Sequence, residues 1–139
     1  MKLNRLRISE EVSGKLSMLK RRTGLTPNIL CRIGFCLSLN DPTITGSDDY
    51  PSDTEKEIDR HTLTGPWDRL FVALIQERCY QDRLPLDDET LAEQFQAHVN
   101  RGVLLFKNVH SLNDLAELMF KDICQYAQIC EAPEPGYAD

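Results

Sequence analysis

The stretch LRISEEVSGKLSMLKRRTGLTPNIL, from Leu6 to Leu30, contains the signals for a short strand followed by two helices. Leu6 and Ile8 alternate with arginines at the period-two spacing of a strand, which places both on one face. Ser9 then supplies a helix N-cap, and Gly24 is well placed to end the helix in the left-handed conformation. The apolar stripe of this first helix repeats at helical spacing: Val12, Leu16 and Leu19.

A second helix is predicted directly after the turn. Thr26 is its N-cap and Pro27 its first residue, and the helix runs roughly to Leu39. It is apolar on most sides, so we expect it at the centre of a core or at a subunit interface. Its predicted buried residues are Ile29, Leu30, Ile33, Phe35, Cys36 and Leu37.

Positive charge is concentrated in this opening segment. The 139-residue chain has a formal net charge of -6, with 16 basic and 22 acidic residues. Eight of the basic residues and only two acidic ones lie between Met1 and Arg32, so that segment carries +6 and the remainder, with eight basic and twenty acidic residues, carries -12. A segregated basic segment can bind phosphate although the whole chain is acidic.

We therefore expect DNA contacts from the exposed cations of this segment, against the alternative of a merely solvated basic helix face. The contacts should be mainly electrostatic and weakly sequence-specific. Arg32 is a weaker candidate because it lies on a largely buried helix. The predicted DNA-binding residues are Lys2, Arg5, Arg7, Lys15, Lys20, Arg21 and Arg22.

The rest of the chain indicates a single, mostly helical domain over residues 1–130, followed by a disordered tail, 131–139. After the basic segment, 1–39, we expect an acidic loop over 40–62, because this stretch is poor in aliphatic residues and contains prolines and a glycine. Residues 63–130 should form a small helical bundle, with helices near 66–81 and 88–107 and a last helix capped by Ser111. The stripe of the last helix is Leu112, Leu115, Ala116, Met119, Ile123 and Tyr126.

Several classes of protein are excluded by simple counts. No run of 18 apolar residues exists, so no membrane span is expected. Five cysteines at irregular spacing point to reduced thiols and a cytoplasmic location. The sequence has no CxxC pair, no zinc-type spacing and no Gly-rich loop before a lysine, so we expect neither a metal nor another cofactor.

Strand, helix, turn and helix within forty residues resemble the ribbon-helix-helix arrangement of small DNA-binding dimers. In such dimers the strands of two chains pair, and their outward side chains enter the major groove. A strand this short is not stable unpaired, which predicts a partner chain. A ribbon-helix-helix transcription regulator is therefore one alternative.

Two motifs carry a more specific resemblance, RRTGLTPN at 21–28 and RHTLTG at 60–65. With the flanking segments, from about Leu6 to Leu118, they resemble the DndE family of DNA sulfur-modification (phosphorothioation) proteins. The resemblance implies a small all-α protein that works with a cysteine desulfurase, a sulfur-transferring iron–sulfur protein and an ATPase to replace a phosphate oxygen of DNA with sulfur. It further implies a homo-oligomer, dimer or tetramer, that binds duplex or nicked DNA without an agreed enzymatic activity.

The sequence gives weak support to two catalytic alternatives, a DNA nicking enzyme and a sulfur relay. A nicking site around His61 needs convergent carboxylates that hold Mg²⁺, and the nearby acids lie in the predicted loop. A sulfur relay through Cys31 or Cys79 competes with the common role of free cysteine as a small buried residue. His98 lies on an apolar stripe and should be a core histidine. We therefore predict no catalytic residues, and a DNA-binding accessory subunit that is oligomeric through its first two helices.

Overall fold

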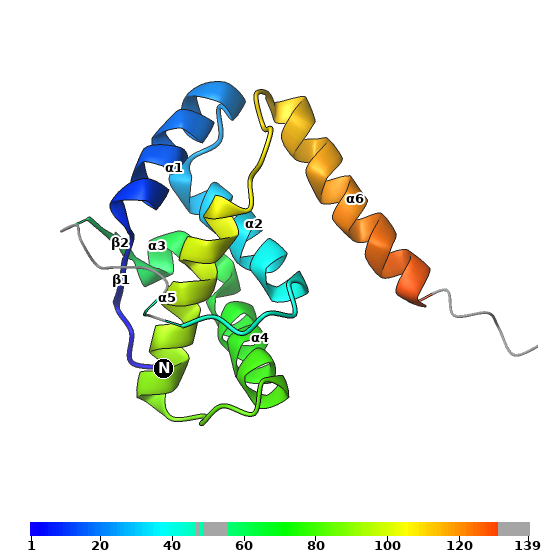
Figure 1. The fold of residues 1–139 in the computed structure, drawn as a ribbon. Coiled ribbons are helices and arrows are strands. Elements are labelled where there is room, and N and C mark those ends of the chain that lie inside the picture. Colours follow the sequence, from blue (N-terminus) through cyan, green and yellow to red (C-terminus); the bar gives the residue numbers. More distant parts are fainter. Residues whose placement is uncertain (47, 49–55, 131–139) are drawn as a thin grey trace, which may run out of the picture.

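The computed structural model describes residues 1–46, 48 and 56–130, with side chains up to residue 121 (Figure 1). The protein is mainly α-helical with one short two-stranded sheet, which confirms the predicted fold class. The predicted disordered tail, 131–139, and part of the predicted acidic loop, 47 and 49–55, lie outside the described residues. The elements are β1 (Arg5–Arg7), α1 (Glu10–Thr23), α2 (Pro27–Asn40), β2 (Glu57–Asp59), α3 (Arg60–Thr64), the 3-10 turn η2 (Gly65–Trp67), α4 (Asp68–Gln81), α5 (Asp88–Leu104) and α6 (Leu112–Cys130).

Both ends of α1 form as the sequence predicts. The Ser9 hydroxyl accepts a hydrogen bond from the Val12 amide at 3.2 Å. Gly24 adopts a left-handed conformation, with φ of 77°, and its amide donates to the Lys20 carbonyl. The predicted stripe is buried: Val12, Leu16 and Leu19. Local capping and one apolar face therefore fix this helix.

The buried face of α2 differs from the prediction. Ile29 and Cys36, both predicted to be buried, are exposed. The inner face instead contains two small residues, Gly34 and Ser38, which a hydrophobicity pattern does not select. Close helix packing therefore rotates the buried face away from the most apolar one. The buried residues of α2 are Leu30, Cys31, Gly34, Phe35 and Ser38.

The strand partner of β1 comes from the same chain, whereas the sequence predicted a second chain. β1 and β2 are antiparallel, with Leu6 opposite Ile58. β2 lies in the segment that the sequence predicted to be a loop. The prediction missed this strand because its three residues include only one apolar side chain and so show no alternating pattern. Leu6 and Ile8 are buried, as predicted.

The other edge of β1 is occupied by side chains of α5. The Gln96 side chain accepts from the Arg7 amide at 2.9 Å, and the Asn100 side chain donates to the Arg7 carbonyl at 3.2 Å. Asn100 also accepts from the Ser9 amide at 3.0 Å. Because β2 and α5 satisfy both edges, β1 offers no free edge for an intermolecular ribbon.

Helices α2 and α5 make the most extensive contact between any two elements of the described chain. Their backbones meet at Gly34 and Gly102, where a Cβ atom on Gly102 would lie 1.8 Å from the Gly34 carbonyl oxygen. Only glycine fits at this crossing. Next to Gly34, Phe35 packs against Phe95 of α5, with ring centroids 5.0 Å apart, and against Phe71 of α4, with ring centroids 5.2 Å apart.

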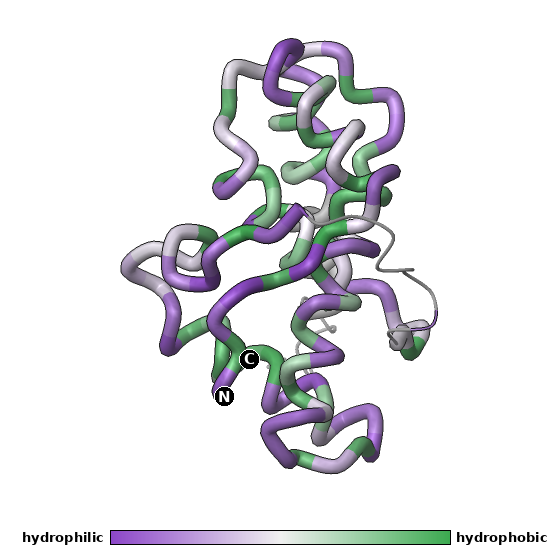
Figure 2. Tube along the Cα trace, turned by 90° about the vertical axis from the view of Figure 1, so that its left-hand side faces the viewer, coloured by the Kyte–Doolittle hydropathy of each residue, from purple (hydrophilic) through white to green (hydrophobic). Residues whose placement is uncertain are grey.

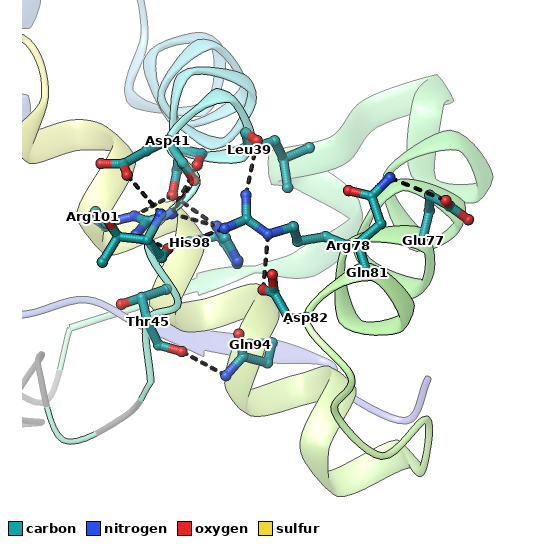
Figure 3. A network of polar contacts seen from close by, with 12 residues as sticks. Leu39, Asp41, Thr45, Glu77, Arg78, Gln81, Asp82, Gln94, His98 and Arg101 are labelled. Carbon is teal, nitrogen blue, oxygen red and sulfur yellow. Dashed lines mark hydrogen bonds and ion pairs between the residues drawn. The ribbon is translucent and has the colours of Figure 1, made fainter.

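Two buried arginines hold the C-terminal end of α2 (Figure 3). Arg101 of α5 donates to the Ser38 carbonyl at 2.8 Å, and Arg78 of α4 donates to the Leu39 carbonyl at 2.8 Å. Both guanidinium groups also reach the Thr43 carbonyl just beyond the helix. The last carbonyls of a helix lack partners within it, so these two cations act as a C-terminal cap.

His98 lies beside these cations in the same network. Its Nδ1 is 2.8 Å from the Ser38 hydroxyl, which also accepts from Arg101 Nε at 2.8 Å. Burial, together with the charges of Arg101 and Arg78, lowers the pKa of His98 to about 3. The imidazole is fully buried and neutral, which confirms the predicted core histidine.

A third buried arginine, Arg60 at the start of α3, fixes the N-terminal segment. It donates to the carbonyls of Met1 and Leu3 at 2.7 and 2.9 Å and forms a bidentate pair with Asp68 of α4. The hydrogen bonds from Arg60 hold the pKa of Asp68 down at about 2. The motif at 60–65 therefore has a structural role, because its arginine joins the chain start to α4.

Helix α6 stands apart from the other helices (Figure 1). Leu115 is buried, but Leu112 and Phe120 are 52% and 66% exposed. The predicted stripe therefore meets the rest of the chain only in part, and its members Ile123 and Tyr126 lie beyond the described side chains. Hydrophobic and hydrophilic residues are interleaved along the helices (Figure 2), and no helix of the described residues is long and apolar enough to cross a membrane.

We predict that Gly102→Ala destabilises the protein by about 3 kcal/mol, because α2 and α5 must separate to admit the methyl group. Urea denaturation measures the change. Gly14→Ala is the matched control, since Gly14 is exposed on α1 with open space around it, and it should stabilise by about 0.5–1 kcal/mol. Equal stability of the two variants would contradict the close crossing.

We predict that stability falls with acidification because of His98. The unfolded histidine binds a proton near pH 6.5, whereas the folded one does so only near pH 3. Between these values the free energy of unfolding should decrease as pH falls, with a slope approaching about 1.4 kcal/mol per pH unit from this group. Urea titrations from pH 7 to 4 measure this slope. In His98→Asn the free energy of unfolding should depend less steeply on pH, and a slope equal to that of the wild type would contradict the prediction.

Candidate nucleic-acid interface

The C-terminal turn of α1 presents an exposed group of cations. Lys20, Arg21 and Arg22 occupy this turn, and all three are exposed. Cations stabilise a helix at its C-terminus because they lie near the negative end of the helix dipole. Part of this charge therefore has a structural effect on α1, while the side chains remain open to solvent.

The connection between α5 and α6 brings a further cation, Lys107, near Lys15 in the middle of α1. Lys15 donates to the carbonyl of Leu104, the last residue of α5, at 3.4 Å, and Arg22 donates to the Val109 carbonyl in the connection at 3.3 Å. Burial lowers the pKa of Lys15; the charge of Glu11 raises it and that of Lys107 lowers it. Lys107 is exposed. We call these five residues the α1 basic group: Lys15, Lys20, Arg21, Arg22 and Lys107.

Sequence reasoning missed Lys107. It is far from α1 in the chain and follows a helix whose other residues carry no basic pattern. Its place near Lys15 depends on tertiary packing, in which α1 binds the Leu104 and Val109 carbonyls on either side of Lys107. No signal in the sequence alone indicates this proximity.

The remaining predicted cations lie at the other end of α1. Lys2, Arg5 and Arg7 are exposed, but Arg5 and Arg7 each lie 3.8 Å from the carboxylate of Glu57 on β2. The two guanidinium groups share one acid and their side chains are 70% and 59% exposed, so the pairs are weak. Further acids lie at this end: Asp59 is opposite Arg5 on β2, and Glu10 and Glu11 occupy the first turn of α1.

The structure therefore divides the seven predicted residues into two groups instead of one patch. At 1.5 Å per residue, the 12 residues from Ser9 to Arg21 place the C-terminal cations of α1 about 18 Å from the β1 group, Lys2, Arg5 and Arg7, with Lys15 between them. The α1 basic group is the denser of the two, and it has gained Lys107. The β1 group is smaller and partly compensated by Glu57.

The motif at 21–28 forms the turn between α1 and α2. The Thr23 hydroxyl donates to the Leu19 carbonyl at 2.7 Å and accepts from the Leu25 amide at 3.2 Å. Thr26 is exposed at the start of α2, and its side chain makes no capping hydrogen bond. The turn thus sets the N-terminus of α2, which favours anions, beside the cations of α1.

Arg32 has a structural position. Its guanidinium donates to the carbonyls of Leu63 and Thr62, and it lies where a Cβ atom on Gly65 would be. The residue thereby joins α2 to α3. This position agrees with its omission from the predicted DNA contacts.

The residues considered for nuclease chemistry also have structural positions. Asp59 caps α3 by accepting from the Thr62 amide at 3.0 Å, and His61 is exposed with its Nδ1 3.9 Å from Asp68. Asp68 is already engaged by Arg60 and by the Thr64 hydroxyl. Within the part of the chain that the structure describes, no three histidine, cysteine or acidic side chains are grouped so as to hold a metal ion.

The cysteines considered for a sulfur relay are poorly suited to it. Cys31 and Cys79 are buried, and burial raises their pKa values to about 12 and about 11. The thiolate is the nucleophilic form, so both residues are unreactive near neutral pH. Cys36 on α2 is exposed.

Together these features define a small, mainly α-helical protein with a strand–helix–turn–helix start, buried arginine clusters and exposed cations at both ends of its first helix. Comparison with known protein families matches residues 5–114 to the family described as DNA sulphur modification protein DndE. The match spans most of the chain, and the chain belongs to the DndE family.

Solved structures agree with this assignment. A crystal structure of DndE from Escherichia coli B7A, involved in DNA phosphorothioation modification, superposes with a TM-score of 0.62 at 25% sequence identity, over 77% of this chain and 99% of that chain. A second structure, of a glycine-to-lysine DndE mutant, has a TM-score of 0.59 at 24% identity, over 75% and 97% of the two chains, and shows the same fold. The comparison with curated proteins found no match.

We predict that Cys36 is alkylated far faster than Cys31 or Cys79. Exposure favours alkylation of Cys36, whereas burial and a raised pKa protect Cys31 and Cys79. Brief iodoacetamide treatment at pH 8, followed by peptide mapping, measures each residue separately. Labelling in 6 M urea is the control and should make all three react alike. Rapid native labelling of Cys79 would contradict its burial.

Proposed function

We propose that the protein is a DNA-binding accessory subunit of a DNA phosphorothioate modification system. Membership of the DndE family supports the system, and the Escherichia coli relative with the same fold is involved in DNA phosphorothioation. The observation that carries the DNA contact is the α1 basic group, in which three cations of one helix turn are exposed and Lys107 lies near Lys15 on the same helix.

The chemistry of the basic group suits phosphate backbones and not base edges. Arginine and lysine side chains on a convex helix end bind phosphate oxygens and release counterions. The start of α2, with Thr26 exposed next to this turn, adds main-chain dipoles of the same sign. We expect binding that depends strongly on salt and weakly on sequence.

The β1 group serves as a second, weaker contact. A separation of about 18 Å along α1 corresponds to about five base pairs of rise along the duplex axis, so the two groups can contact phosphates within about half a turn of DNA. If about five phosphates are neutralised, the log–log slope of affinity against salt should be about -4 to -5.

Assembly is part of the proposal. We propose a homo-oligomer, dimer or tetramer, that uses the outer face of α2, where Ile29 and Cys36 are exposed and Ile33 is half-buried. A symmetric assembly presents several copies of the α1 basic group, which raises avidity for duplex or nicked DNA. The sulfur-transferring iron–sulfur protein and the ATPase of the system are the proposed protein partners.

A charge-reversal experiment tests the DNA contact. Lys20→Glu/Arg21→Glu should reduce affinity for nicked and intact duplex at least tenfold in fluorescence anisotropy at low salt, because it removes two phosphate contacts and adds repulsion. It should also reduce the magnitude of the salt slope by about 2. Arg22 is left unchanged because it binds the Val109 carbonyl.

Arg69→Glu/Arg83→Glu is the matched control. It changes the net charge by the same amount at exposed sites outside both basic groups, so affinity should change little. Equal binding by the wild type and the Lys20/Arg21 variant would refute the assigned surface. An equal loss of DNA affinity in both variants would mean that binding depends on total charge and not on the α1 basic group.

A further inference from the structure

The exposed side of α6 carries an apolar stripe. Leu112 and Phe120 are 52% and 66% exposed, and Ala116 lies between them at the same helical spacing. The family match ends at residue 114, so most of α6 lies beyond it. Two of the three residues of this stripe, Ala116 and Phe120, therefore lie outside the part that defines the family.

The inner side of α6 is already in contact with the body of the protein. Leu115 is buried, and Met119 lines a groove with Cys36 of α2, Trp67 of η2 and Leu70 of α4. Phe120 follows Met119 by about 100° around the helix, so it points away from that groove. Among the described residues, the rest of the protein leaves Leu112 and Phe120 largely uncovered.

The outer side of α6 has a hollow of about 420 Å³. It is lined by Ala116, Glu117, Phe120 and Lys121, and its surface is almost entirely apolar. The small side chain of Ala116 leaves the space, and Phe120 projects beside it. One helix therefore presents both a hole and a side chain of the kind that fills it.

The charges on the rim of the hollow are of opposite sign. Glu117 lies toward the start of the helix and Lys121 one turn later, and both are exposed. When two copies of such a helix pack antiparallel, with the symmetry axis between residues 118 and 119, Glu117 of each copy lies within one residue of the position opposite Lys121 of the other. The same register brings Phe120 of each copy within one residue of the position opposite Ala116 of the other.

The geometry points to α6 as a self-association element, in which the outer faces of two α6 helices from two copies of this chain pack antiparallel. Each favourable contact then occurs twice, as a two-fold interface requires. This contact adds an interface to the proposed homo-oligomer and does not depend on DNA binding.

Mass measurement on the full-length protein tests the pairing. Sedimentation equilibrium under reducing conditions should give an even number of chains for the wild type. Phe120→Glu should halve that mass, because it places a charge in the apolar hollow. Tyr80→Glu is the matched control, since Tyr80 is a 69% exposed aromatic residue on α4, and it should keep the wild-type mass.

Charge reversal with rescue identifies the partner as a second copy. Glu117→Lys and Lys121→Glu should each weaken association about tenfold, because each creates two like-charge contacts per dimer. The double variant restores both pairs and should associate like the wild type. Association with a different protein chain would give no rescue.

Three results would overturn the proposal: a monomeric wild type at 100 µM, an unchanged mass for Phe120→Glu, or a double variant weaker than both single variants. Circular dichroism of each variant confirms that the body remains folded. The Lys20→Glu/Arg21→Glu variant is measured in parallel and should keep the wild-type mass. Loss of pairing and loss of DNA binding are thus separate results.

Discussion

The close crossing of α2 and α5 is the constraint on which the rest of the structure depends. With no side chain at Gly34 or Gly102, the two backbones meet directly, and α5 lies across the inner face of α2. The position of α5 then determines two distant sets of contacts. Gln96 and Asn100 occupy the free edge of β1, and Arg101 reaches the carbonyls at the end of α2. A methyl group at the crossing would disturb both sets, because a close-packed interior transmits such displacements.

Buried arginines make many of the polar contacts between distant segments of this protein. Arg60 joins the N-terminal segment to α4, and Arg78 and Arg101 join α4 and α5 to the end of α2. Burying a cation is costly unless its donors are satisfied, and here carbonyl oxygens and the acids Asp68 and Asp82 accept them. Burial beside two of these cations keeps His98 neutral, so the same network makes stability depend on pH.

Some arginines of this protein have structural roles, whereas other cations are exposed on its surface. Residues that are equally basic in sequence have different surroundings: Arg32 and Arg60 bind carbonyl oxygens, whereas Lys20 and Arg21 face solvent. The exposed cations gather at the end of α1, within the family-matched region, and the apolar stripe of α6 lies largely beyond that region. The two proposed tasks, phosphate binding and self-association, therefore fall on different surfaces.

The sequence by itself determined the local features: the caps and end of α1, the turn into α2, the predominance of helix and the buried, neutral His98. These depend on residues within a turn or two of one another, so caps, glycines and apolar spacing predict them. Only the tertiary structure decided that β2 pairs with β1, that Gly34 and Ser38 turn inward in place of Ile29 and Cys36, and that Lys107 joins the α1 basic group. Each of these outcomes depends on packing between segments far apart in the chain, and small residues or single charges leave no periodic signal of such contacts.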